Sequence, residues 1–368
     1  MSDEFLYVQI YKDLFEEIKQ EKYKIGDKLP TEKEVSEKYN VSRITAQRAM
    51  NMLVDDGIIV RYSGVGSFVA SKEEKIEDNV NTEKKTIGMV VETIWNSFGI
   101  EVFNGAYRKA EELGYNLVLK KSNGNQIAEM KAIEELIQMG ASGIIIMPVH
   151  GDYYSDRILK LFVEGYPIVF LDRYLHGIHV PFVSSDNILA TSQAVSYFIK
   201  NGHQHIGLVT GLDKETTTLD DRKQGFIQSI LESGLQINKE YIYDKVMSRL
   251  PGQDYEATFK KIIEDIKEFI ESNSDMTAII AAEYDIAVLV KKAIEDLGKS
   301  VPEDMEIICF DSPEYILGNY PFTHIKQNEN EMGTKAVEML NRVIIGEKQK
   351  ERILLDTELI LGDSTKNN

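Results

Sequence analysis

The sequence predicts an α/β protein in which two doubly wound parallel-sheet subdomains follow an N-terminal winged helix-turn-helix domain. Three observations support this fold class. The chain of 368 residues is too long for one ordinary hydrophobic core. Its first 70 residues have the pattern of three helices and a hairpin. Beyond Lys85, apolar strand-like runs alternate with amphipathic helical segments. We expect a first domain at 1–70, a linker at 71–85 and a large domain of two α/β subdomains at 86–368.

The first two helices have clear signals. Apolar residues recur every fourth position near the start, at Leu6, Ile10, Leu14 and Ile18. This spacing predicts a first helix with one apolar stripe. After Pro30, Thr31 and Glu34 have the spacing of a capping box, in which the hydroxyl and the carboxylate satisfy reciprocal amides. A short second helix should follow, to about Tyr39.

A third helix and a hairpin complete the first domain. Ser42 is a suitable N-cap for a helix that begins at Arg43, and Gly57 should end it. Helical spacing directs Ala46, Ala49, Met50 and Leu53 inward. The segments Ile58–Tyr62 and Ser67–Ala70 are strand-like, and the turn-rich Ser63-Gly64-Val65-Gly66 joins them.

The opposite face of the third helix has the side chains that DNA recognition requires. It presents Arg43, Ile44, Gln47, Arg48 and Asn51. Arginine can pair bidentately with guanine and glutamine with adenine, while an aliphatic side chain can contact a thymine methyl group. Ser42 and Thr45, at the helix N-terminus, suit phosphate groups. The alternative is an ordinary solvated helix face, but the preceding capped helix and the glycine-rich hairpin favour DNA.

The charge distribution restricts where DNA can bind. The net charge of −18 would ordinarily argue against a nucleic-acid partner. However, the first 70 residues carry a net charge of only −2, and Lys22 to Met50 holds seven basic residues against four acidic ones. Any contact with DNA should therefore come from this segment.

The stretch LPTEKEVSEKYNVSRITAQRAMNMLVDDGIIVRYSGVGSFVA resembles the DNA-binding domain of the gluconate-repressor (GntR) family. The match runs along nearly all of residues 5–70. The resemblance implies DNA contacts from Lys33, Arg43, Thr45 and position 47, with the wing tip at Ser63, Gly64 and Gly66 entering the minor groove. One departure concerns the arginine that the family often carries at 47, since this chain has Gln47 followed by Arg48. The base preference at that point is therefore not predicted.

The rest of the chain predicts parallel sheets covered on both faces. Residues 71–85 are charged and nearly free of apolar residues, as in a solvated linker. The apolar runs after it are TIGMVV, YNLVL, GIIIM, PIVFL, HIGLVT, TAIIAA and MEIICF. Helical patterns between them include Phe103–Leu113, Ile127–Met139, Thr191–Asn201, Tyr284–Leu297 and Glu331–Ile345. In such sheets ligands bind beyond the carboxyl ends of the strands.

Residues near those strand ends have the chemistry of a sugar site. Sugars need aromatic faces and planar, charged hydrogen-bonding groups. The candidates are Trp95, Asn96, Phe98, Ser122, Asp172, Arg173, Arg222, Glu283 and Asp311. Taken singly, each charged residue is equally compatible with a surface ion pair or a loop cap, and Trp95 with a core position. Jointly, charges at four strand ends favour a binding site.

The large domain also resembles the effector domain of the lactose/galactose-repressor (LacI) family, whose fold is similar to periplasmic sugar-binding proteins. The resemblance covers about residues 85–362, through motifs such as PIVFLDR, NGHQHIGLVTG and VPEDMEIICFDSPEY. It implies ligand contacts at Asp172, Arg222, Glu283 and Asp311. Many sugar regulators carry asparagine at position 283, so the glutamate implies a different hydroxyl pattern. A GntR-type head on this domain is uncommon and resembles arabinose-responsive repressors, which makes L-arabinose a candidate effector.

Other features of the sequence exclude or weaken further functions. Cys309 lies in an apolar run and has no cysteine to pair with, which fits a buried core residue in a reducing cytoplasm. His203 and His205 have metal-like spacing but no apparent third ligand, so a structural turn is favoured over a metal site. We recognise no phosphate-binding glycine loop with lysine, no G-x-S-x-G elbow, no leader and no membrane-spanning run. No catalytic residue and no cofactor are expected.

The sequence therefore predicts a cytoplasmic, sugar-responsive transcriptional repressor. A homodimer would bind a double-stranded, pseudo-palindromic operator, and a small sugar would close the cleft between the subdomains and modulate DNA binding. Two alternatives remain. The large domain alone would suit a solute-binding protein for sugar uptake, and some gluconate-type heads carry enzyme-like domains.

Overall fold

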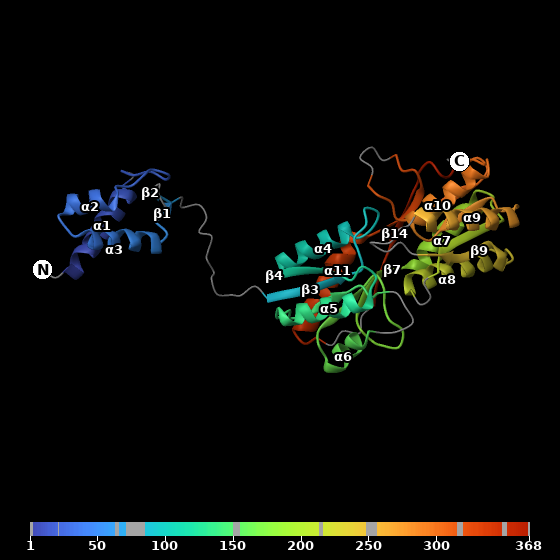
Figure 1. The fold of residues 1–368 in the computed structure, drawn as a ribbon, viewed down its shortest axis with the longest axis horizontal. Helices are drawn as coiled ribbons and strands as arrows, with labels where there is room; N and C mark the ends of the chain where they lie inside the picture. Colours follow the sequence, from blue (N-terminus) through green and yellow to red (C-terminus); the bar gives the residue numbers. More distant parts are fainter. Residues whose placement is uncertain are drawn as a thin grey trace. The chain divides into compact units, whose positions relative to one another are not determined.

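The computed structural model describes residues 3–20, 22–62, 66–70, 85–149, 155–212, 216–247, 256–314, 319–347 and 352–366. The chain forms two compact units, residues 1–83 and 84–368 (Figure 1). The predicted linker, residues 71–85, lies outside the described residues except for Lys85, the first residue of strand β3.

The first unit is a small helical domain with a two-stranded antiparallel sheet. Its elements are α1 (Asp3–Lys19), α2 (Glu32–Tyr39), α3 (Arg43–Asp55), β1 (Ile59–Tyr62) and β2 (Gly66–Val69). The capping box is confirmed, because the Thr31 hydroxyl accepts from the Glu34 amide at 3.3 Å and the Thr31 amide donates to the Glu34 carboxylate at 2.7 Å. Gly57, at φ +65°, follows the end of α3 as predicted.

The core of this unit follows the predicted pattern. Ala46, Ala49, Met50 and Leu53 of α3 are buried, and they pack with Ile10 and Leu14 of α1, Val35 of α2 and Ile59 and Val69 of the hairpin. Such a small domain buries little apolar area in total. Each of these contacts therefore matters for fixing the orientation of α3.

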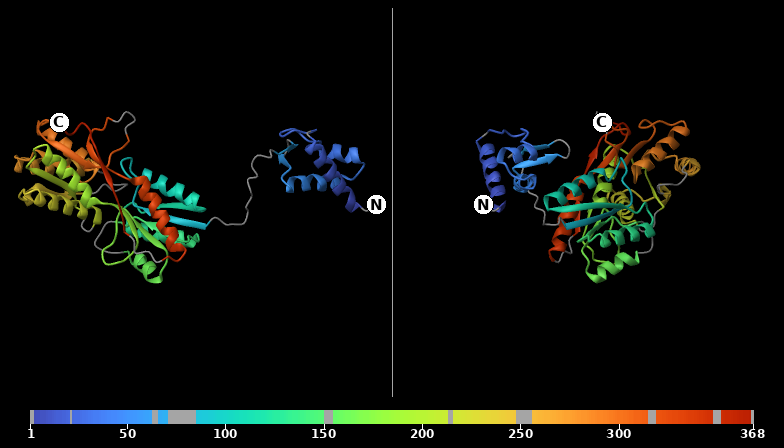
Figure 2. Two further views of the ribbon diagram at one scale, coloured as in Figure 1. Left: turned by 180° about the vertical axis from the view of Figure 1, so that it is seen from behind. Right: turned by 60° about the vertical axis from the view of Figure 1, so that its left-hand side comes forward.

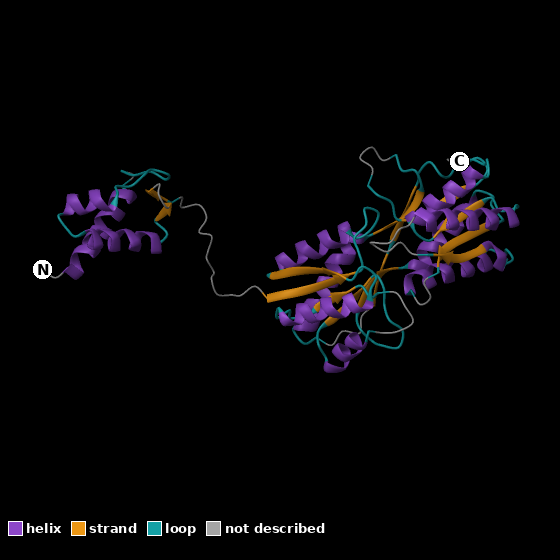
Figure 3. Cartoon of the chain, viewed as in Figure 1, coloured by secondary structure: helices purple, strands orange, loops and turns teal. Residues whose placement is uncertain are grey.

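The second unit consists of two lobes, each built on a six-stranded sheet (Figures 1 and 3). The first-lobe sheet has the order β13-β7-β6-β5-β3-β4, and its strands pair in parallel. Its strands are β3 (Lys85–Val91), β4 (Tyr115–Lys121), β5 (Ile144–Ile146), β6 (Ile168–Leu171), β7 (Phe182–Ser185) and β13 (Arg352–Leu355). Its helices are α4 (Ile100–Glu112), α5 (Gln126–Gln138), α6 (Asp156–Glu164) and α11 (Glu329–Ile344).

The second-lobe sheet has the order β14-β12-β11-β10-β8-β9. Its strands are β8 (Ile206–Gly211), β9 (Ile242–Val246), β10 (Ala278–Ala281), β11 (Glu306–Phe310), β12 (Thr323–Gln327) and β14 (Thr357–Ile360). Its helices are α7 (Asn187–Lys200), α8 (Thr217–Glu232), α9 (Glu256–Ser272) and α10 (Tyr284–Asp296), with a short 3-10 turn at Lys239–Tyr241.

Both sheets are covered on both faces, so the predicted doubly wound fold class is confirmed. In the first lobe α4 and α11 cover one face and α5 and α6 the other. In the second lobe α9 and α10 cover one face and α7 and α8 the other. Continuous apolar runs such as Ile144–Ile146 are buried throughout because both of their faces meet helices.

The structure also corrects the strand prediction. Strand β14 pairs antiparallel to β12, so the second sheet is mixed. Strands β7, β9, β12, β13 and β14 were not among the predicted runs. Several of them carry polar or charged residues, such as FVSS and THIKQ. Partner strands, and not an apolar run in the sequence, specify these segments.

The chain crosses between the two lobes three times, from β7 to α7, from β12 to α11 and from β13 to β14. The crossings lie side by side, because Ser185 pairs with Leu355 and Gln327 pairs with Thr357. Figure 2 shows the late segment of the chain, drawn in red, running between the lobes. Helix α11 is therefore part of the first lobe although most of the second lobe precedes it in sequence.

Helices α4 and α11 cross at two glycines. A Cβ at Gly333 would overlap the Val102 carbonyl oxygen, and one at Gly105 would overlap the Asn330 carbonyl oxygen. Only hydrogen atoms fit at these positions, so the close approach depends on glycine. The Glu329 carboxylate also accepts from the Gly99 amide at 2.7 Å, and so caps the N-terminus of α4.

We predict that Gly333→Ala destabilises the first lobe by about 1–3 kcal/mol, since the added methyl group meets backbone that cannot move alone. The measurement is urea unfolding followed by the fluorescence of Trp95, the single tryptophan of the chain, which follows β3 in the first lobe. Lys335→Ala on the same helix is the matched control and should change stability by less than about 0.5 kcal/mol. Equal midpoints for both variants would contradict the close-packing argument.

Candidate DNA-binding surface and ligand cavity

The outer face of α3 carries the predicted side chains. Arg43, Ile44, Gln47 and Arg48 are exposed, and Ile44 keeps 77% of its surface accessible. This exposure leaves the Ile44 side chain accessible to a partner. Ser42 is also exposed at the N-terminus of the helix, where amides and the helix dipole favour an anion.

The structure corrects the prediction that Thr45 faces outward. Its surface is only 7% exposed, and its hydroxyl lies 2.7 Å from that of Ser42, which also accepts from the Thr45 amide. Thr45 therefore lies beneath the outer face and holds Ser42 in position. The sequence pattern placed it outward because the helical N-terminus was treated as wholly exposed.

Two arginines near the outer face are held by neighbouring elements: Arg48, which was predicted, and Arg61, which was not. The guanidinium group of Arg48 lies 4.2 Å from the ring centre of Tyr7 on α1, a cation–π contact. Arg61 of β1 donates to Asn51 of α3 at 3.0 Å and pairs with Glu32 of α2 at 3.0 Å. Arg61 thus ties the hairpin to both helices, a role that the sequence alone did not indicate.

The remaining predicted DNA residues flank α3. Lys33 on α2 is exposed and forms an ion pair with Glu37, one turn along the same helix, at 3.8 Å. Ser63 and Gly64 lie outside the described residues. Gly66 begins β2 at φ +135°, and a Cβ there would lie 2.6 Å from the Lys28 side chain. The glycine therefore lets Lys28 lie along the base of the hairpin.

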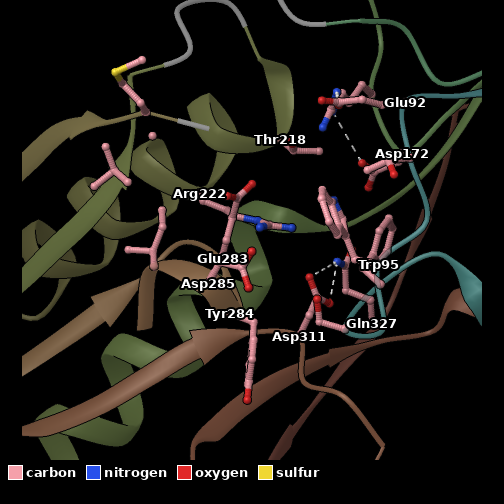
Figure 4. Close-up of a pocket in the computed structure, with 18 of the residues that line it drawn as sticks. Glu92, Trp95, Asp172, Thr218, Arg222, Glu283, Tyr284, Asp285, Asp311 and Gln327 are labelled. Carbon is pink, nitrogen blue, oxygen red and sulfur yellow. Dashed lines mark hydrogen bonds and ion pairs between the residues drawn. The ribbon is translucent and has the colours of Figure 1, made fainter. Parts of the chain in front are cut away.

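A cavity lies between the two lobes of the second unit (Figure 4). Its walls come from the carboxyl ends of strands in both lobes and from α8, α9 and α10. Seven of the nine predicted effector residues line it: Trp95, Phe98, Asp172, Arg173, Arg222, Glu283 and Asp311. The rule that parallel sheets bind ligands beyond their strand ends located most of this cavity.

The other two predicted residues do not line it. Ser122 is fully buried after β4, where its hydroxyl donates to the Val91 carbonyl at 3.3 Å. No residue at the end of β4 lines the cavity, so the prediction for Ser122 was wrong. Asn96 lines an adjoining cavity that shares Phe98 and Asp311 with the main one.

Asp172 and Asp311 occupy equivalent positions in the two lobes. Each follows the last residue of a strand, β6 or β11, and each has a left-handed backbone, at φ +62° and +64°. The Asp172 amide donates to Val183 at 2.7 Å and the Asp311 amide to Ile325 at 3.0 Å. This geometry is uncommon for a residue other than glycine and clusters at binding sites.

Arg173 belongs to an ionic group at the first-lobe wall. It donates to Glu92 at 2.6 Å and to the Pro148 carbonyl at 3.3 Å, and lies 3.8 Å from the Asp172 carboxylate. Burial alone lowers the pKa of Arg173, but the carboxylates of Glu92 and Asp172 more than offset this and raise it. Arg173 is therefore charged, and much of its role is to orient the two carboxylates.

Arg222 reaches the cavity from α8. It is buried, and it donates to Asn187 at 2.8 Å and to the Ala282 carbonyl at 2.6 Å. Its guanidinium carbon also lies 3.8 Å from the ring centre of Phe310. These contacts fix its plane, as bidentate recognition of hydroxyl groups requires.

Asp311 joins the cavity to the crossings between the lobes. Gln327 donates to both of its carboxylate oxygens, at 2.9 and 3.1 Å (Figure 4). It also accepts from Ser185 at 2.7 Å. Burial raises the pKa of Asp311 to about 7, although Arg222 and the Gln327 hydrogen bond act to lower it.

Trp95 and Phe98 form the aromatic part of the first-lobe wall. The Trp95 amide donates to Phe98 at 3.0 Å and the Phe98 amide donates back at 3.3 Å, so the two residues close a tight turn. Gly99 follows at φ +106°, which other residues rarely adopt. The turn presents both rings to the cavity.

Sequence reasoning missed several residues of the cavity: Glu92, Thr218, Tyr284, Asp285 and Gln327. Glu92 directly follows a predicted run, so the strand-end rule could have found it. Gln327 ends a strand that was not predicted.

His203 and His205 contact neighbouring side chains of the second lobe. His203 contacts Thr277 at 2.7 Å and Glu306 at 3.4 Å, while His205 contacts Tyr241 at 3.0 Å. Within the described ranges, no cluster of three histidine, cysteine or carboxylate side chains could hold a metal ion. No described helix is both long enough and apolar enough to cross a membrane.

Comparisons with known proteins match both units. Residues 6–69 match the gntR family of bacterial regulatory proteins, and residues 195–365 match the periplasmic binding protein-like domain. The chain is 28% identical to the arabinose metabolism transcriptional repressor of Geobacillus stearothermophilus, over 98% of this chain and 97% of that protein. It is 25% identical to the ribose import binding protein RbsB of Escherichia coli, over 76% of this chain and 91% of that protein.

Solved structures support the fold of the large domain. The transcription regulator CcpA of Lactococcus lactis has a TM-score of 0.66 at 22% identity, covering 77% of this chain and all of that chain. A regulatory protein of the LacI family from Chloroflexus aggregans has a TM-score of 0.62 at 22% identity, covering 76% of this chain and 98% of that chain. The chain thus joins a helix-turn-helix head of the gntR type to a periplasmic-binding-protein-like domain.

Proposed function

We propose that the chain is a sugar-responsive transcriptional repressor that binds operator DNA through α3 and the hairpin. One observation carries the proposal: the same chain has a winged head with an exposed recognition face and a cavity lined by charged groups from two lobes. A relative named as an arabinose metabolism transcriptional repressor aligns over nearly the whole length, which supports L-arabinose as the first sugar to test.

The head has the groups that operator binding requires. Arg43 and Gln47 would contact base edges, and Ile44 a thymine methyl group. Lys33, Ser42 and Arg48 would contact phosphates, with Arg48 fixed by Tyr7. A homodimer would place two such heads on a pseudo-palindromic operator in the cytoplasm, where bacterial DNA lies.

The cavity has the groups that a sugar requires. Asp172, Glu283 and Asp311 would accept hydrogen bonds from hydroxyl groups, while Arg222 would donate them. Trp95 and Phe98 offer faces for stacking on the C–H groups of the ring. For the sugar to act on DNA binding it must favour one arrangement of the lobes, and coupling of about 1–3 kcal/mol is typical.

A solute-binding role is the second candidate, because a ribose import binding protein aligns with 76% of the chain. The DNA-binding head favours regulation instead. We also infer that the cavity binds its sugar without turnover. Recovery of unchanged sugar after long incubation, measured by NMR, is the expected result, and product formation would contradict it.

We predict that Arg43→Ala weakens operator binding by roughly 5- to 150-fold, the range for losing one bidentate base contact. The measurement is a gel shift with the operator upstream of the gene or with fragments selected from random DNA. Sugar binding, followed by Trp95 fluorescence, should not change. Lys19→Ala, an exposed change on α1, is the control. Normal operator binding by the Arg43 variant would exclude the proposed recognition helix.

We predict that Asp311→Asn weakens sugar binding by roughly 10- to 100-fold, because the carboxylate becomes an amide that accepts less strongly. Trp95 fluorescence titration of the full chain gives the dissociation constant. Operator binding without sugar should persist, while release of the operator should need a correspondingly higher concentration of sugar. An unchanged dissociation constant would remove Asp311 from the proposed site.

The raised pKa of Asp311 predicts a pH dependence. Sugar hydroxyls that donate to the ionised carboxylate should bind more weakly as pH falls from 8 to 6, by at most about tenfold per unit below pH 7. The stability of the protein without sugar should depend on pH in the opposite direction. The ionised form destabilises the fold, so the second unit should lose stability as pH rises from about 4 through 7. Asp311→Asn should remove the contribution of this carboxyl to the pH dependence of both sugar affinity and stability. The Glu129 carboxyl, whose pKa burial also raises to about 7, should still make the stability of the variant depend on pH.

A further inference from the structure

The strand ends of the second lobe form a gradient of polarity across the cavity. From the crossings outward, the sheet order is β12, β11, β10, β8 and β9. The cavity residues at or just after these strands are Gln327, Asp311, Glu283, Gly211 and Val246, in that order. Three hydrogen-bonding side chains are thus followed by a residue without a side chain and then by an apolar one.

The outer end of the cavity is apolar well beyond this one strand. Its wall consists of Val246 and Met247 at the end of β9, Phe259 of α9, and Ile286 and Leu289 of α10. We name these five residues the apolar wall. Val246 and Ile286 also belong to the lobe's hydrophobic core, so core packing holds the wall in place.

A bare sugar would not need this wall. The apolar face of a sugar ring is already served by Trp95 and Phe98, which come from the other lobe. Neighbouring strands lie roughly 4.8 Å apart, so the end of β9 is on the order of 10 Å from that of β10 and 20 Å from that of β12. A single sugar ring covers only part of this span. Gly211, between the polar and apolar ends, leaves room for a ligand to continue from one to the other.

We propose that the effector is a glycoside, with its sugar at the polar end of the cavity and an apolar alkyl or aryl substituent against the apolar wall. This rests on the proposed function, since it names the class of sugar bound at the same site. Burial of the substituent strengthens binding by about fourfold for each methyl-sized group removed from water. The free sugar alone fills the polar end and binds more weakly.

The test uses the full chain and the fluorescence of Trp95, its single tryptophan. L-arabinose is compared with its methyl and phenyl glycosides in both anomeric forms, with calorimetry as a second readout. We expect one phenyl glycoside to bind at least tenfold more tightly than L-arabinose. Glycosides that all bind no better than L-arabinose would overturn the proposal while leaving sugar sensing intact. If neither L-arabinose nor any glycoside binds, both the glycoside proposal and the proposed function are contradicted.

Two variants of α10 assign the preference to the apolar wall. Leu289→Gln should reduce the affinity ratio of the phenyl glycoside to L-arabinose to less than a third of its original value. Val288→Gln, at an exposed position outside the cavity lining on the same helix, should leave the ratio unchanged. The ratio is insensitive to partial unfolding, because inactive protein affects both ligands equally. An unchanged ratio in the Leu289 variant would contradict the placement of the substituent.

Discussion

The hydrogen bonds that run from Ser185 through Gln327 to Asp311 connect the cavity of the large unit to the crossings between its lobes. Gln327 is 4% exposed and Ser185 only 1%, so the hydrogen bond between them is shielded from water. Both residues end strands where the chain passes between the lobes. A change in the charge or contacts of Asp311 therefore acts on two of the three crossings at once. This is the physical basis on which occupancy of the cavity can alter the relation of the lobes.

The two left-handed aspartates show how the fold places charge at the cavity. Asp172 and Asp311 each follow a buried strand, and each adopts a backbone that costs on the order of 1–3 kcal/mol. The conformation turns the chain sharply and brings the carboxylate to the lobe interface. Each lobe thus contributes one such group, and the arginines Arg173 and Arg222 limit the repulsion between them.

Local signals explain what the sequence could predict. The head was predicted almost completely, because the Thr31–Glu34 capping box and the spacing of Ala46 to Leu53 depend only on near neighbours. Strands with continuous apolar runs were found for the same reason. Strands such as β12 and β9 were missed, because their sequences, THIKQ and IYDKV, are interrupted by polar and charged residues. Six cavity residues followed from the strand-end rule, and Arg222 was predicted although it lies on α8. The prediction for Ser122 failed because no residue at the end of β4 lines the cavity, and Gln327 was missed because its strand went unrecognised.

The position of α11 in the chain sets the order in which a newly made protein can become complete. The last strand of the head, β2, ends at Val69, long before the cavity is finished. The first lobe needs α11 and β13, which leave the ribosome only after most of the second lobe, and β14 completes that lobe last. A chain halted during synthesis would carry a whole DNA-binding head without a working sensor. The late helix thus makes sensing the final property that the protein acquires.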